Sequence, residues 1–207
     1  MPLIHLQQIN NSTKIGVWHI TEAEDFFFQN ISLQQSITHP HKRLQHLAGR
    51  HLLHVLFPSF PTALIKIAST KKPFLEDEAF HFSISHCGAY AAAIVSTQDR
   101  VGVDIETPHP KIETIKHKFV TQQEQNILEN FSTNNIQMLT MAWSIKEAIF
   151  KWYSLGQVDF KKHIQINTLQ NIDNQIVAQC TFCKANPIKL IVKNVILEGN
   201  NLSWVVS

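Results

Sequence analysis

Cysteine is scarce in this sequence, and its three copies, Cys87, Cys180 and Cys183, argue against a disulfide framework. An odd and low count is typical of proteins from a reducing compartment. The N-terminus also lacks the basic stretch and long apolar run of a signal peptide, so we expect a cytoplasmic protein. Cys180-x-x-Cys183 has neither a second pair nor a histidine at zinc spacing, and we assign it no metal or redox role.

Long hydrophobic runs and a strong net charge are also absent. No stretch reaches the roughly 20 apolar residues that a membrane-spanning helix requires. The formal net charge is only +2, whereas a dedicated nucleic-acid binder would be expected to carry a concentrated basic stripe. We therefore expect neither a membrane nor a nucleic acid as partner. With 44% hydrophobic residues among 207, the chain can form one sizeable core or two small ones.

The apolar periodicity predicts a mixture of strands and helices. Alternation of apolar and polar residues indicates strands, and apolar spacings of three and four indicate helices. The expected strands are 14–20, 80–86, 90–96, 101–105, 188–197 and 202–206; the expected helices are 22–30, 42–56, 121–131 and 136–154. We expect 80–105 to form an antiparallel meander, and Thr121 to cap the third helix, with Glu124 in its first turn.

The first segment with recognisable chemistry is Gly102-Val103-Asp104-Ile105-Glu106. On a strand, Asp104 and Glu106 share one face because successive side chains alternate. Two neighbouring carboxylates repel each other and need a cation or a shared proton. Oxygen-only ligands of this kind suit a hard ion such as Mg²⁺. The alternative interpretation is a strand with a solvated acidic edge.

The second segment is Trp143-Ser144-Ile145-Lys146-Glu147-Ala148-Ile149-Phe150-Lys151. On a helix, Glu147 and Lys151 lie one turn apart, which is also the spacing of an ordinary surface ion pair. The bulky or apolar residues around them, which continue to Trp152, predict that this helix is mostly buried. Buried charges are costly unless they are paired or hold an ion, so the composition favours a functional role.

The two segments together resemble the signature pair of the phosphopantetheinyl transferases, Gly-Val-Asp-Ile-Glu followed by Trp-Ser-x-Lys-Glu-Ala-x-x-Lys. The chain length is similar to the surfactin-synthetase-activating type, which holds two similar halves in one chain. The resemblance implies an α/β fold, α+β in the stricter sense, in which each half is a small, mainly antiparallel sheet packed with helices. It also implies a monomer with its active site in the cleft between the halves.

Further segments resemble elements of the same family. Leu47-Ala48-Gly49-Arg50 is similar to the helix that bears a coenzyme A-binding arginine, and Lys42 and Arg43 precede it. Lys72-Pro73 resembles the end of a Gly-Lys-Pro element in which Lys71 replaces the glycine. Phe82-Ser83-Ile84-Ser85-His86 is similar to a Phe-Asn-x-Ser-His element, with Ser83 in place of asparagine. Phe119-Val120-Thr121-x-x-Glu124 resembles a Phe-x-x-x-x-Glu element. The last 50 or so residues carry no element that matches.

The resemblance implies transfer of 4′-phosphopantetheine from coenzyme A to a serine of an apo acyl or peptidyl carrier protein, with release of adenosine 3′,5′-bisphosphate. Residues 101–207 would carry the metal-binding and catalytic motifs. Asp104, Glu106 and Glu147 would hold Mg²⁺, Lys151 would contact the α-phosphate, and Glu147 would act as base, with Glu124 as runner-up.

By the same resemblance, residues 1–100 would bind the nucleotide of coenzyme A. The implied nucleotide-binding residues are Lys42, Arg43, Arg50, Lys72, Pro73, Ser85 and His86, together with Lys151. His86 is one of twelve histidines, so an incidental role is the alternative for that residue.

Two other functions are compatible with the same residues. Clustered carboxylates and a lysine also serve Mg²⁺-dependent nucleases and phosphodiesterases, in which the metal activates water. The second alternative is a non-catalytic module that binds carrier proteins. The product formed, and coenzyme A binding measured beside turnover, would separate these functions from the transferase.

Overall fold

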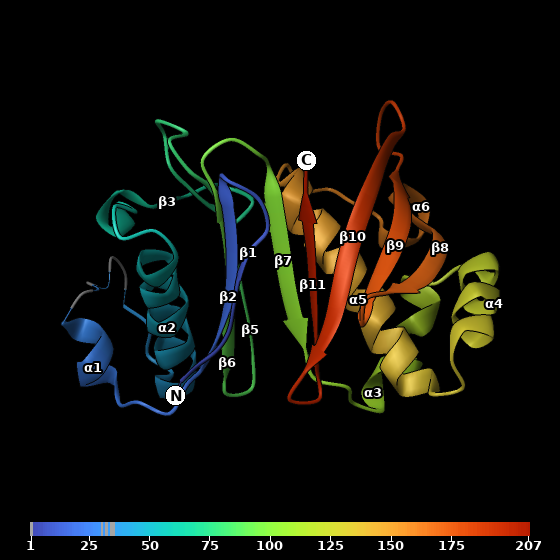
Figure 1. The fold of residues 1–207 in the computed structure, drawn as a ribbon, viewed down its shortest axis with the longest axis horizontal. Helices are drawn as coiled ribbons and strands as arrows, with labels where there is room; N and C mark the ends of the chain where they lie inside the picture. The colour runs from blue at the N-terminus through green and yellow to red at the C-terminus, as the bar shows by residue number, and fades with distance from the viewer. Residues whose placement is uncertain (1, 30, 32, 34–35) are drawn as a thin grey trace. The chain divides into compact units, whose positions relative to one another are not determined.

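Two antiparallel sheets, each packed against one long helix, form the core of the structure, a computed structural model that describes residues 2–29, 31, 33 and 36–207 (Figure 1). The chain divides into two units, Met1–Val101 and Gly102–Ser207. These sheets and helices confirm the expected α+β fold class. What each unit binds remains a prediction.

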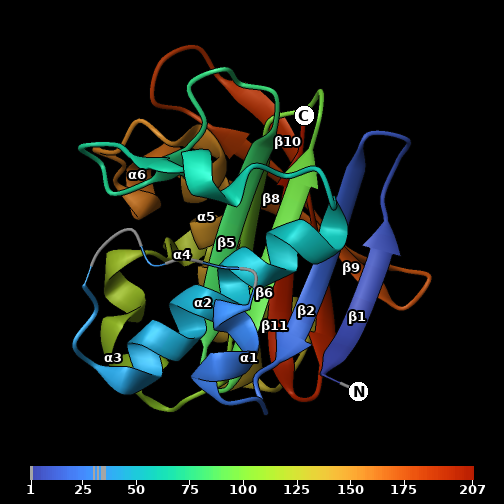
Figure 2. The same ribbon diagram turned by 90° about the vertical axis from the view of Figure 1, so that its left-hand side faces the viewer.

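The first unit contains a four-stranded sheet in the order β1-β2-β6-β5. Helix α2 packs against β2, β6 and β5 and crosses one face of the sheet (Figure 2). The bounds are β1 Leu3–Gln8, β2 Thr13–His19, α1 Glu24–Phe28, α2 Pro40–Leu56, η1 Thr62–Leu64, β3 Lys66–Ile67, β4 Pro73–Phe74, β5 His81–Cys87 and β6 Tyr90–Ser96.

Helix α2 begins where the sequence provides a proline and a cap. The His39 side chain accepts a hydrogen bond from the Lys42 backbone N–H, and Pro40 stands in the first turn, where its missing N–H costs nothing. Gly49 lies against the sheet, because a Cβ there would come within 2.7 Å of Ile84 Cγ2. The close approach lets this face of α2, which includes Arg50, lie near β5.

The second unit contains a five-stranded sheet in the order β7-β11-β10-β9-β8. Helix α5 packs against β11, β10 and β8, and apolar side chains of α5 and these strands form the core. The bounds are β7 Val101–Glu106, α3 Lys111–Ile115, η2 Lys116–Lys118, α4 Gln122–Phe131, α5 Asn135–Tyr153, α6 Phe160–His163, β8 Ile164–Ile172, β9 Gln175–Phe182, β10 Ile188–Leu197 and β11 Asn200–Val206.

The helices with clear local signals are confirmed. Thr121 caps α4 in a capping box: its side chain accepts from the Glu124 N–H, and the Glu124 carboxylate accepts from the Thr121 N–H. Helix α5 is largely buried, as its apolar composition predicts. The helix expected at 22–30 is shorter, at Glu24–Phe28, and Asn30 lies outside the described residues. Sequence patterns gave no indication of β1.

The predicted three-stranded meander is wrong in its last strand. Strands β5 and β6 pair as expected, but β7 pairs with β11 in the sheet of the second unit. The turn before β7 is tied to the β1–β2 turn, because the Asp99 carboxylate accepts hydrogen bonds from the Ser12 and Thr13 hydroxyls. This turn is therefore not a tight hairpin that would pair β7 with β6.

In the described ranges, no helix combines the length and apolarity needed to cross a bilayer.

Gly102 should be required for the packing of α5 on β7. A Cβ at this position would overlap the backbone of Ala148 and Trp152, neither of which can swing away. We expect Gly102→Ala to lower the free energy of unfolding by about 3 kcal/mol in denaturant titrations. Gly16→Ala is the matched control, since its Cβ would meet mainly flexible ends of Leu52 and Leu56 and should cost about 1 kcal/mol. Equal effects would refute the close packing.

Candidate active site

The two sequence motifs meet in the second unit, on β7 and α5. Asp104 and Glu106 lie on β7, and Glu147 lies on α5, which contacts β7 through a hydrogen bond from the Ser144 hydroxyl to the Asp104 carbonyl. Both β7 carboxylates act electrostatically on Glu147. The fold thus brings together the three carboxylates that the sequence motifs indicate.

Glu147 lies in an environment that opposes its negative charge. Burial raises the pKa of Glu147 to about 7, and the negative charges of Asp104 and Glu106 contribute to the increase, while Lys151 opposes it. A carboxyl group among other carboxylates is stabilised as an anion only by added positive charge. The site therefore favours a cation.

Lys151 supplies positive charge from within the chain. Its Nζ lies 2.6 Å from Asp104 Oδ1, and the Asp104 side chain is only 3% exposed whereas that of Lys151 is 24% exposed. The Lys151 ammonium group thus contacts a buried carboxylate while its side chain remains partly accessible to solvent. This arrangement holds a positive charge at the edge of the carboxylate cluster, where an anionic ligand can approach it.

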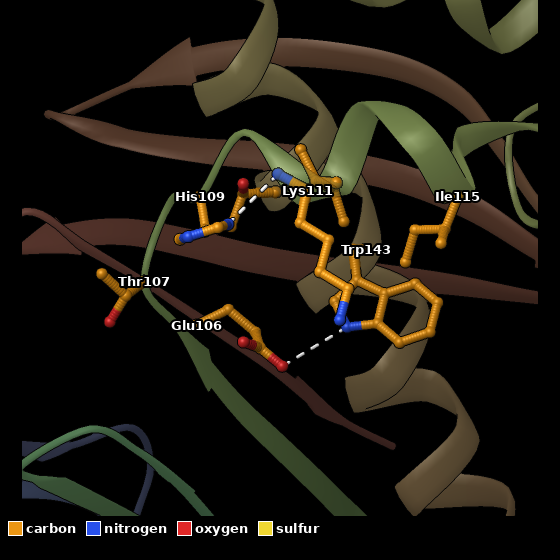
Figure 3. A pocket seen from close by; sticks show the side chains of 8 residues that line it. Glu106, Thr107, His109, Lys111, Ile115 and Trp143 are labelled. Atoms are coloured by element: carbon orange, nitrogen blue, oxygen red, sulfur yellow. Dashed lines mark hydrogen bonds between the residues drawn. The ribbon is translucent and has the colours of Figure 1, made fainter.

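Glu106 lines a cavity of about 260 Å³, whose other lining residues come from the segment after β7, from α3 and from α5 (Figure 3). The indole Nε1 of Trp143 donates to Glu106 Oε1 over 3.3 Å, and the two side chains point toward each other across the cavity wall. On the opposite wall the His109 ring accepts from the Lys111 backbone N–H. Trp143 also borders a larger cavity of about 920 Å³, which Glu147 lines together with Phe150 and Phe160.

The donor set at these carboxylates has the chemistry that Mg²⁺ prefers. All three candidate ligands are carboxylates, and Mg²⁺ commonly binds through one or two carboxylates while substrate phosphates and waters supply the other ligands. Within the described part of the chain, no three His, Cys, Asp or Glu side chains are arranged so that they could hold a metal ion by themselves. An open site completed by phosphate oxygens fits this arrangement.

Glu124 belongs to a different cluster, buried beside α5. Its Oε1 lies 2.6 Å from Lys146 Nζ and accepts from the Ile166 N–H, and its Oε2 accepts from Thr121. Lys146 is fully buried and also donates to the carbonyls of Phe119, Phe160 and Ile164. Both charges are therefore saturated by protein groups. The geometry favours a structural role for Glu124.

A separate cationic cavity of about 460 Å³ lies in the first unit. Its polar lining comes from α2, from β5 and from the loop before β4, and it contains the predicted residues Arg50, Pro73 and His86. Arg50 is only 7% exposed, and within the described residues its guanidinium has no hydrogen bond or carboxylate partner. Among the described residues that line the cavity none is acidic, so an anionic ligand would be attracted to it.

The pKa values around this cavity reflect its buried positive charge. Burial lowers the pKa of Arg50 to about 10. Burial also lowers the pKa of His46 to about 4, and the nearby Arg50 and His86 add to the decrease. The pKa of Lys72, beside the cavity loop, falls to about 8 through burial and the charge of Arg100. Each shift shows that a positive charge is unfavourable at this place in the protein, and a bound anion would remove that free-energy cost.

The remaining predicted nucleotide-binding residues lie in varied surroundings. Lys42 is exposed in the first turn of α2. Arg43 is engaged, because its Nε donates to Glu24 over 2.8 Å and its Nη1 donates to the Ile37 carbonyl. Ser85 is buried on β5, and Lys72 lies outside the cavity lining. The structure thus brings Arg50, Pro73 and His86 to one cavity but not Arg43.

Comparison with known proteins concerns mainly the second unit. A family model described as the 4′-phosphopantetheinyl transferase superfamily matches residues 100–198. Residues 100–198 are therefore similar to this superfamily. The matched region, as we call residues 100–198, includes both motifs, all three candidate metal ligands and the Glu124–Lys146 pair.

Curated relatives agree with this assignment. Enterobactin synthase component D of Salmonella typhi is 36% identical over 117 residues, which cover 55% of this chain and 49% of the relative. A protein of Haemophilus influenzae proposed as a 4′-phosphopantetheinyl transferase is 29% identical over 127 residues, 58% of this chain and 53% of the relative. The chain thus spans about half the length of these relatives.

Sequence reasoning gave no role to several residues that the structure places at these sites. His46 precedes Arg50 by one helical turn, a spacing that could have indicated a shared face of α2. Lys146 stands inside the superfamily motif, yet only the structure identifies it as the buried lysine of the segment. Lys71 lines the cationic cavity, although the sequence comparison treated it only as a replaced glycine.

Removing the buried Lys146 charge should strongly destabilise the second unit. Lys146→Met would leave the Glu124 carboxylate buried beside an apolar group, and we expect the free energy of unfolding to fall by about 3–5 kcal/mol. Denaturant titration followed by tryptophan fluorescence measures this. Lys162→Met is the matched control, since Lys162 is 79% exposed and should cost about 0.5 kcal/mol or less. A Lys146→Met variant as stable as that control would contradict the buried pair.

The pKa of His46 should report on charge in the cationic cavity. In an NMR titration we expect a pKa of about 4 in the free protein. Because this value is below the ordinary 6.5, the folded state should lose stability as the pH falls from about 6.5 to 4. Arg50→Met removes a neighbouring positive charge and should raise the His46 pKa. Lys14→Met, outside the cavity lining, should leave it unchanged; equal pKa values in both variants would contradict the arrangement.

Proposed function

We propose that this protein transfers the 4′-phosphopantetheine group of coenzyme A to a serine of an apo acyl or peptidyl carrier protein, with Mg²⁺ as cofactor. The observation that carries the proposal is the gathering of Asp104, Glu106 and Glu147 beside Lys151, within the part of the chain that the superfamily model matches. The name of the Haemophilus influenzae relative points to the same chemistry.

We further propose the surfactin-synthetase-activating type, in which one chain supplies both halves of the enzyme and acts as a monomer. The presence of two units in one chain supports this proposal. In it, the cationic cavity of the first unit takes the nucleotide and the carboxylates of the second unit take the pyrophosphate. Arg50 and His86 would then contact the 3′-phosphate, and Lys42, Lys72 and Ser85 would surround it.

Asp104, Glu106 and Glu147 would hold Mg²⁺ through their carboxylate oxygens. When bound there, Mg²⁺ would neutralise charge on the pyrophosphate oxygens of coenzyme A. The Asp104 carboxylate has a second function in this arrangement, because it also fixes the position of the Lys151 ammonium group. Loss of Asp104 would therefore disturb both the metal site and the lysine.

The chemical step is attack of the carrier serine oxygen on the β-phosphorus of coenzyme A. A new O–P bond forms, the bond from the β-phosphorus to the bridging oxygen breaks, and its electron pair remains on adenosine 3′,5′-bisphosphate. Charge grows on that leaving oxygen, and the Lys151 ammonium can neutralise or protonate it. The proton of the serine hydroxyl passes to a carboxylate base.

Glu147 is the preferred base over Glu124. Both oxygens of Glu124 accept hydrogen bonds from protein groups, and its side chain is 3% exposed, so a substrate hydroxyl could reach it only by displacing these partners. Glu147 instead lines a cavity of about 920 Å³. Access to the substrate therefore favours Glu147.

Intact-protein mass spectrometry of apo carrier proteins tests the proposal. Incubation with this protein, coenzyme A and Mg²⁺ should add one phosphopantetheine to the carrier serine, and EDTA should prevent the addition. Release of a coenzyme A hydrolysis product without carrier modification would favour a phosphodiesterase. Metal-dependent coenzyme A binding without any product would favour a non-catalytic carrier-binding module, and either result would refute the transferase.

Two substitutions should separate binding from chemistry. We expect Glu147→Gln to reduce transfer at least about 10³-fold, because it removes both a metal ligand and the base. Lys151→Ala should lower kcat by about 10²-fold but weaken coenzyme A binding less, because it acts mainly on the leaving group. Lys162→Ala, an exposed lysine outside the site, is the control. Rates near wild type in both site variants would refute the assignment.

A further inference from the structure

The loop between β3 and β4 is a three-residue hairpin connection. The Lys71 N–H donates to the Ala68 carbonyl over 2.8 Å, and the Ala68 N–H donates to the Lys72 carbonyl over 2.9 Å. Ser69, Thr70 and Lys71 are the three residues between these ends. In such loops the last residue adopts the left-handed conformation, which glycine favours because it lacks a Cβ.

Lys71 occupies this left-handed position with φ of 66°. An L-residue with a long side chain is disfavoured there, and the conformation has an energetic cost that glycine or asparagine would avoid or reduce. The family element that this segment resembles has glycine at the corresponding place, which agrees with the backbone geometry. The loop geometry therefore gives no preference for lysine over glycine at this position.

The surroundings of Lys71 supply a reason for the lysine. Lys71 lines the cationic cavity together with Arg50, His46 and His86, and none of the lining residues is acidic. Arg50 is nine-tenths buried, and within the described residues no protein anion balances its guanidinium charge. A second cation at the same cavity is unfavourable for the empty protein and becomes favourable when a multiply charged anion binds.

The charge required matches one group of the proposed substrate. A phosphate monoester carries close to two negative charges at neutral pH, since its second pKa is about 6. Coenzyme A has one such group, the 3′-phosphate of its ribose, besides the pyrophosphate that we assign to the carboxylate site. Arginine and lysine together neutralise a dianion, whereas a single arginine would leave one charge uncompensated.

We propose that Lys71 is a binding residue for the 3′-phosphate, and that it adds selectivity for 3′-phosphorylated nucleotides in a left-handed loop position where glycine would relieve strain. This inference rests on the proposed function, because it takes coenzyme A as the ligand. The side chain acts through its charge, and the loop places that charge beside Arg50. Lysine at this position thus makes the loop less stable than glycine would and strengthens binding of the 3′-phosphate.

Isothermal titration of the full chain with adenosine 3′,5′-bisphosphate and with adenosine 5′-monophosphate tests the inference. Lys71→Gly and Lys71→Asn both remove the charge and both suit the left-handed conformation. We expect each to weaken binding of the bisphosphate by about tenfold and binding of the monophosphate by less than about twofold. Lys71→Arg should retain most of the selectivity, and thermal unfolding should show Lys71→Gly to be no less stable than wild type.

Lys66→Asn is the matched control, since Lys66 belongs to the same hairpin, pairs with Glu76 over 2.6 Å and does not line the cavity. It should bind both nucleotides as wild type does. Wild-type selectivity in Lys71→Gly and Lys71→Asn would overturn the role of Lys71 and leave the proposed function standing, as would equal losses for both nucleotides. A wild-type protein that fails to prefer the bisphosphate would instead overturn nucleotide binding at this cavity.

Discussion

Lys146 places a positive charge in the core of the second unit, and the parts of the candidate active site depend on how that charge is compensated. Its ammonium group contacts Glu124 at the start of α4 and the carbonyls of Phe119, Phe160 and Ile164. One side chain of α5 thus joins α4, α6 and β8. Because a buried charge tolerates little displacement of its partners, this contact fixes α5, the helix that also carries Glu147 and Lys151.

The two candidate binding regions have opposite electrostatic character. In the second unit, burial and the neighbouring carboxylates raise the pKa of Glu147, so that region favours a cation. In the first unit, burial and the charges of Arg50 and His86 lower the pKa of His46, so that cavity favours an anion. A ligand such as metal-bound coenzyme A, which presents both a cation and a phosphate monoester, would satisfy each region. This complementarity is the physical basis of the proposed function.

Both candidate binding regions contain groups that destabilise the folded protein when no ligand is bound. Three carboxylates beside one another, an arginine with no anionic partner among the described residues, and a lysine in a left-handed loop position are each unfavourable in the protein alone. The fold compensates through features that are unrelated to the ligand, including the capping box of α4 and the close packing of α5 on β7 at Gly102. The motif glycine therefore serves packing, whereas the motif acids serve the site.

Local sequence patterns indicated the charged groups of the candidate site in the second unit and most of the helices. The acidic motif, the helical motif and the Thr121 cap are local patterns, because alternation, helical spacing and capping act within a few residues. The folded structure was needed to show that β7 pairs with β11, that Lys146 binds Glu124, and that Lys71 lies at the cavity of Arg50. These contacts join residues that are distant in the chain. They form because folding buries the surfaces that carry them, and no local sequence pattern records that burial.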